Sequence, residues 1–185
     1  MQNTVHVIAS RVQKHTKGAT IMQTQKSILA AAVILAISTI AGYAAPFTNG
    51  GFDTGTLSPG WTGLVDRPAA TVEAGYASLN PPQDGGYCAV YHGQSGELPA
   101  IRQTFDTEAN AEYPYKVSLY YGRAQSTTRT DLGFVIDVFD GVKTDSTGSG
   151  DLFSAETPIP PQSWTLYEFE FFAVSDTTTI RIWED

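Results

Sequence analysis

The stretch YKVSLYYG, residues 115–122, alternates large apolar side chains with smaller or more polar ones. In an extended chain, Tyr115, Val117, Leu119 and Tyr121 fall on one face, because successive side chains of a strand point to opposite sides. Such alternation is typical of a strand whose one face is buried and whose other face is wetter. It indicates a β-sheet protein with a core on one side of this strand.

Two further stretches, FVIDVF at 134–139 and WTLYEFEFF at 164–172, alternate in the same way, and we expect these three strands to form the core. Shorter runs rich in Val, Ile, Thr, Tyr and Phe recur between Gly, Pro, Asn and Asp clusters, without sustained helical periodicity. The expected strands are 61–65, 70–73, 76–79, 87–92, 100–105, 115–122, 134–139, 164–174 and 178–183. This pattern predicts an all-β fold with a single core, a β-sandwich or a jelly roll.

One long loop is expected over residues 140–161, which are rich in Gly, Ser and Thr and end in prolines. Counted from Asp145, Gly150 and Glu156 occupy positions six and twelve of an EF-hand loop. Positions three and five lack a carboxylate or amide, and no helix is predicted on either side. A solvated hairpin loop is therefore favoured over a calcium-binding EF-hand.

The N-terminal part reads as a leader. From Met22 the chain runs MQTQKSILAAAVILAISTIAGYAA, with a basic start, an apolar run and small residues up to Ala44. This pattern predicts a secretory signal peptide over 22–44, preceded by a segment without acids that suits a long n-region or an upstream start. The apolar run is shorter than the ~20 residues of a membrane anchor. We expect residues 1–44 to be a leader, residues 45–185 to form the domain, and the product to be secreted, periplasmic or at the cell surface.

The charge balance argues against polyanionic partners. The chain has 11 Lys and Arg against 19 Asp and Glu. The leader holds four of the bases and no acid, which leaves seven bases against 19 acids in the mature chain, a net charge of −12. Nucleic acid and anionic lipid surfaces would be repelled, whereas cations would be attracted. No membrane span is expected in the mature chain.

Catalysis has little support in the sequence. His92 is the only histidine after residue 44, which does not supply a nucleophile, base and acid together. Glu168 and Glu170 lie two apart on one strand, which is also the spacing of any exposed face. Cys88 is the only cysteine, and its apolar neighbours favour a buried, inert thiol. We therefore expect no enzyme.

The entry segment NGGFDTGTLSPGWTG, residues 49–63, resembles the N-G-x-F-E-x-G-x-x-x-x-W entry of galactose-binding-like jelly rolls. These include carbohydrate-binding modules and an uncharacterised-domain family of plant cell walls and secreted bacterial proteins. GGYCAVYHG at 85–93, IRQTFDTEANAEYPYKVSLYYGRA at 101–124 and WTLYEFEFFAVSDTTTIRI at 164–182 follow in the family's order. Two departures are Asp53 in place of Glu and the absence of the usual closing strand before Asp185.

In physical terms the entry segment needs no ligand. Phe52 is expected to plug the core, and Gly55 and Gly60 to bracket a surface loop that delivers Trp61 to the sheet. The resemblance adds a structural Ca²⁺ between the entry turn and the last strand. Its expected ligands are Asn49, Asp53 and Asp185, hard oxygen donors that suit calcium. The alternative is that Asp53 bonds turn amides.

The resemblance implies a single jelly-roll β-sandwich and, with it, a binding function. A jelly roll offers a concave face and loop tips where aromatic rings stack on sugars of a polysaccharide or glycan. The expected ligand-binding residues are Tyr120, Trp164, Trp183 and Arg123, of which each aromatic has packing as its alternative role. A second interpretation is an exported structural or cell-surface protein with no small ligand.

Overall fold

The computed structural model describes residues 3–14, 47–74, 87–93, 98–110, 112–123, 133–159 and 161–184. These residues form nine β-strands, and none forms a helix long and apolar enough to cross a membrane. The strands are β1 (Asn3–Lys14), β2 (Thr71–Glu73), β3 (Cys88–Gly93), β4 (Ala100–Asp106), β5 (Tyr115–Arg123), β6 (Phe134–Asp140), β7 (Phe153–Glu156), β8 (Thr165–Phe171) and β9 (Thr177–Glu184).

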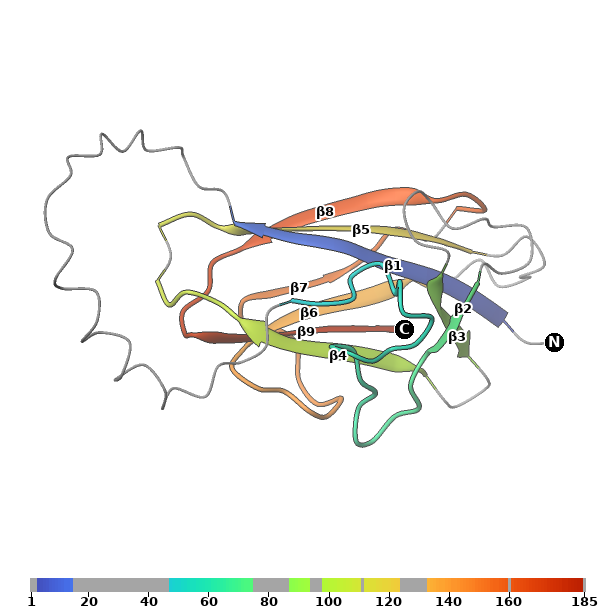
Figure 1. The fold of residues 1–185 in the computed structure, drawn as a ribbon, viewed down its shortest axis with the longest axis horizontal. Helices are drawn as coiled ribbons and strands as arrows, with labels where there is room; N and C mark the ends of the chain where they lie inside the picture. The colour runs from blue at the N-terminus through green and yellow to red at the C-terminus, as the bar shows by residue number, and fades with distance from the viewer. Residues whose placement is uncertain are drawn as a thin grey trace, which may run out of the picture.

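The strands form two antiparallel sheets. Sheet A has five strands in the order β2-β3-β1-β5-β8, and sheet B has four in the order β4-β9-β6-β7. Figure 1 shows the two sheets as layers, with β5 and β8 above and β4, β6 and β9 below. The prediction of an all-β chain with a sandwich-like arrangement is thus confirmed, because each sheet has an apolar face to bury against the other.

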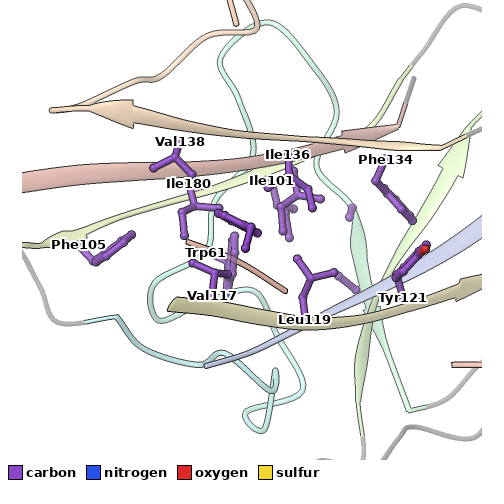
Figure 2. Packing of buried hydrophobic residues seen from close by; sticks show 14 of the residues in the cluster. Trp61, Ile101, Phe105, Val117, Leu119, Tyr121, Phe134, Ile136, Val138 and Ile180 are labelled. Atoms are coloured by element: carbon purple, nitrogen blue, oxygen red, sulfur yellow. The ribbon is translucent and has the colours of Figure 1, made fainter. Parts of the chain in front are cut away.

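The core lies between the two sheets and contains the expected alternating residues. Side chains of β5, β6 and β9 meet there with Trp61 and Phe105, as Figure 2 shows. Phe153 and Phe169 stack across the layers with ring centroids 4.1 Å apart. Burial of each such side chain stabilises the fold by roughly 1.5–3 kcal/mol. The residues of the main core cluster on the three predicted core strands are Tyr115, Val117, Leu119, Tyr121, Phe134, Ile136, Val138, Phe169, Phe171 and Ala173.

The entry segment closes one part of this core, as expected. Phe52 is fully buried, and its ring lies 5.8 Å from that of Trp61. The Trp61 indole donates to the Asn49 carbonyl at 3.1 Å, which holds the entry turn on the core. Gly60 has a φ of +101°, and a Cβ there would lie 2.0 Å from Gln103 Nε2. This position therefore requires glycine.

Some strand boundaries differ from the prediction. The expected strand 61–65 reduces to an isolated bridge between Thr62 and Arg102, because the chain turns away after one pairing. The expected loop 140–161 contains β7, whose four residues pair with β6 and bring Phe153 to the core. Four residues are too few for their alternation to stand out from a loop. The expected strand 76–79 lies outside the described residues.

The largest difference concerns the leader. Residues 3–14 were expected to take no part in the fold, but they form β1, which pairs with β3 on one side and β5 on the other. Thr4, Val5, Val7 and Ile8 are β-branched and suit a strand. Without β1, β3 would keep only its partner β2 and β5 only its partner β8, and the edge of each strand that faces β1 would lose its partner. The predicted signal peptide at 22–44 lies outside the described residues.

Candidate functional site

The outer face of sheet A brings two of the predicted ligand-binding aromatics together. Tyr120 on β5 lies directly opposite Leu166 on β8, and Trp164 precedes Leu166 by two residues on the same side. Tyr121 on β5 and Phe169 on β8 occupy the alternate positions of these strands and are buried, so the side that carries Tyr120, Trp164 and Leu166 faces away from the core. Tyr120 and Trp164 are half-buried, whereas Leu166 is 45% exposed. We call Tyr120, Trp164 and Leu166 the sheet A apolar patch.

Polar groups continue the same face next to the patch. Ser118 donates a hydrogen bond of 2.7 Å to Glu168, which also pairs with Lys116 at 2.9 Å. The hydrogen bonds from Lys116 and then Ser118 lower the pKa of Glu168, so this carboxylate is ionised at neutral pH. The face therefore offers a hydroxyl, an ammonium and a carboxylate beside apolar surface.

Trp164 also serves the packing of sheet A. It packs against a small cluster of Cys88 and Val90, both fully buried. The thiol of Cys88 is free and buried, as expected. One part of Trp164 is thus packed against β3, while the residue stays partly exposed. A preformed ring loses little conformational entropy when a ligand stacks on it.

Trp183 lies on the other sheet and does not join the sheet A apolar patch. It follows the buried Ile182 on β9, so its ring is on the outer side of sheet B. Its indole N–H donates to Asp137 at 3.0 Å, and the Arg67 guanidinium lies 4.7 Å from its ring centroid. Arg123 ends β5, but its side chain lies outside the part of the chain that the structure describes.

A buried ion pair on sheet B was not predicted. Arg181 and Asp137 are directly opposite on β9 and β6, their closest N–O distance is 2.6 Å, and each side chain is 1% exposed. Arg181 also donates to the carbonyls of Asp145 and Gly148, so the loop after β6 covers it. The available signal was a charged residue inside each of two apolar strands, FVIDVF and TTIRIW.

Hydrogen bonds keep the Asp137 carboxylate ionised in this site. Burial raises its pKa, but the hydrogen bonds from Arg181, the Gly150 amide, Ser154 and Trp183 outweigh burial and hold the pKa below its ordinary value. A buried charge with this many donors is a structural feature that orients its neighbours. It fixes the outer face of sheet B, on which Trp183 and Arg67 lie.

The expected calcium ligands are only partly placed. Asn49 donates through Nδ2 to the carbonyls of Thr56 and Leu57, and its Oδ1 is buried with no hydrogen-bond partner. A buried amide oxygen without a hydrogen-bond partner is the kind of ligand that Ca²⁺ binds. Asp53 is exposed, and Asp185 lies outside the described residues. Within the described residues, no group of three or more His, Cys, Asp or Glu surrounds one point.

Comparison with known proteins adds no relative: no protein-family model, curated protein or solved structure matches the chain.

Proposed function

We propose that this chain is an exported, non-catalytic carbohydrate-binding module of the galactose-binding-like jelly-roll type. The observation that carries the proposal is the sheet A apolar patch beside the Ser118–Glu168–Lys116 group. Partly exposed rings can stack on the C–H-rich face of a sugar, and the neighbouring hydroxyl and charged groups can bond its hydroxyls.

The ligand is a polysaccharide or glycan bound weakly. Tyr120 and Trp164 supply stacking surface, and Glu168 and Ser118 supply partners for sugar hydroxyls. One or two stacked rings and a few hydrogen bonds, set against the cost of association, correspond to a dissociation constant on the order of micromolar to millimolar. Binding to a repeating polymer raises the apparent affinity where several modules engage one chain.

The absence of catalysis is part of the proposal. A glycosidase needs a carboxylic acid that stays protonated to donate to the leaving group, and such a group has a raised pKa. Glu168, the carboxylate nearest the patch in register, has a lowered pKa because Lys116 and Ser118 donate to it. It therefore suits accepting hydrogen bonds from hydroxyls and does not suit proton donation.

Two further parts rest on the sequence. Export follows from the signal-peptide pattern over residues 22–44 and places the module in the secreted, periplasmic or cell-surface space. A structural Ca²⁺ at the entry turn would be held by Asn49 and Asp53, with Asp185 as the expected third ligand. When bound, it would supply charge neutralisation and rigidity to the turn.

The test is polysaccharide retention by Tyr120→Ala and Trp164→Ala in affinity electrophoresis, after a glycan array has selected the polymer. Each variant should lose retention while remaining folded; the melting temperature should stay near that of the parent for Tyr120→Ala and fall for Trp164→Ala, because Trp164 packs against Cys88 and Val90. Phe172→Ala is the matched control, because Phe172 is an aromatic residue that is 57% exposed beyond the other end of β8. Unchanged retention in both patch variants would remove sheet A as the site.

The exported structural protein without a small ligand is the alternative. It predicts that no polymer on the array is retained, even at millimolar concentration of binding sites. Release of reducing sugar by the purified chain would contradict both interpretations.

A further inference from the structure

The outer face of sheet B carries two arginines to which the described residues supply no acidic partner. Arg67 lies over Trp183 and donates to the Leu98 carbonyl at 3.5 Å, and within the described residues no carboxylate pairs with it. Arg102 on β4 has a buried Nε with no hydrogen-bond partner. Lys116, Lys143 and Arg181 are instead in ion pairs. Two guanidinium groups that have no acidic partner among the described residues are unusual in a chain with 19 acids.

The two arginines lie near the same aromatic residue, Trp183. Arg102 is directly opposite Arg181, and Ala100 is directly opposite Trp183, on the adjacent strands β4 and β9. Arg102 is therefore a diagonal neighbour of Trp183 on the same face, at a spacing of roughly 7–8 Å. Arg67 lies 4.7 Å from the Trp183 ring centroid, so both arginines are neighbours of this one residue, Arg67 by contact and Arg102 by strand register.

The electrostatics of this face lack one negative charge. Like charges directly opposite each other on neighbouring strands destabilise a sheet. Asp137 neutralises Arg181, but no carboxylate among the described residues neutralises Arg102. Asp66, next to Arg67 in the chain, is engaged by the amide and hydroxyl of Ser146, which lower its pKa. An anion bound between Arg67 and Arg102 would supply the missing charge.

The scaffold around the two arginines is rigid. Trp183 is held by its hydrogen bond to Asp137, and the loop that carries Arg67 is tied to the loop after β6 by the bond from the Val65 amide to the Thr144 carbonyl. These bonds fix the ring beside Arg67 and the loop that carries Arg67, and the planar donors of a guanidinium match the geometry of a carboxylate.

We propose that Arg67 and Arg102, flanking Trp183, form a second binding site for the single carboxylate group of a small ligand. The chain as a whole carries a net charge of −8, which disfavours a polyanion and favours a ligand with one negative charge. The site lies on the opposite sheet from the sheet A apolar patch, so it stands whether or not that patch binds polysaccharide. The class of ligand that fits is a carboxylated sugar, since Trp183 provides apolar surface beside the charge.

The test uses D-glucuronate as the probe and D-glucose as its neutral match, titrated at constant ionic strength into the full chain. Tryptophan fluorescence should change saturably with glucuronate, with a dissociation constant in the millimolar range, and not with glucose. Arg67→Gln and Arg102→Gln should each weaken glucuronate binding about tenfold or more, the effect of one lost hydrogen bond to a charged group. Lys143→Gln should bind as the parent does, because Asp145 already neutralises Lys143.

Melting curves establish that each variant is folded. Where a glutamine variant does not fold, the corresponding lysine variant is measured, which keeps the charge but loses the planar donors and should also bind more weakly. Equal responses to glucuronate and glucose, or unchanged affinity in the folded arginine variants, would overturn the proposal.

Discussion

Trp183 and Asp137 are joined by a hydrogen bond of 3.0 Å from the indole N–H to Oδ2, the same carboxylate oxygen that pairs with Arg181. One buried oxygen therefore holds the Arg181 guanidinium under the loop after β6 and fixes the orientation of the Trp183 ring on the same outer face of sheet B. The stability of the sheet and the geometry of its surface depend on the same carboxylate.

Asp137→Ala is expected to destabilise the fold by about 3–5 kcal/mol, because it leaves the Arg181 guanidinium buried without its partner. Chemical denaturation measures this change. Glu168→Ala is the matched control: it breaks the exposed Lys116–Glu168 pair, whose loss should destabilise the fold far less because water screens the two charges. Similar losses in the two variants would contradict the structural importance of the buried pair.

Acid should weaken the fold through the same residue. The pKa of Asp137 is lowered below its ordinary value of 3.8 in the folded state, so its contribution to stability is fully present above pH 3.8. The contribution is lost as the pH falls below that value and passes the folded-state pKa. Melting temperatures measured between pH 6 and pH 2 should therefore fall more steeply for the parent than for Asp137→Asn. Parallel curves would show that Asp137 does not titrate with unfolding.

Calcium should stabilise the fold through the entry turn. A ligand that binds only the folded state adds about 2.7 kcal/mol at 100 times its dissociation constant, which is visible as a rise in melting temperature. Asp53→Ala should abolish that rise, whereas Asp151→Ala, an exposed acid in the loop after β6, should keep it. A parent melting curve that is the same in excess calcium and in excess chelator would exclude the site.

The strand β1 and the signal peptide make opposing demands on the leader. Cleavage after Ala44 separates residues 3–14 from the domain, yet in the structure these residues pair with both β3 and β5. A chain of residues 45–185 is therefore expected to melt at a lower temperature than the full chain, because two strand edges lose their hydrogen-bonding partners.

A synthetic peptide of residues 3–14 should restore part of this melting temperature when added to the shortened chain. The same peptide with Ile8→Pro is the control, since proline removes a ladder donor from the middle of the strand. Equal melting temperatures of the two chains, without response to the peptide, would show that β1 is dispensable. Mass spectrometry of exported protein would then be expected to find Ala45 as the first residue.

Alternation along the chain determined most of the strands and the core. The stretches around Val117, Ile136 and Phe169 repeat with a period of two, and that period alone decides which side chains share a face. The burial of the entry segment could be predicted as well, because Phe52 and Trp61 are large apolar residues between glycines, and both are buried. These features depend on neighbours in the sequence, so they can be predicted without a structure.

The tertiary structure decided which strands pair and in which register. Asp137 and Arg181 lie 44 residues apart, and only the pairing of β6 with β9 makes them an ion pair. Tyr120 and Leu166 meet through the pairing of β5 with β8, while Trp183 is carried to the other sheet. Alternation assigns a side chain to a face but does not say which strand lies beside it, because strand pairing depends on contacts between residues distant in the chain.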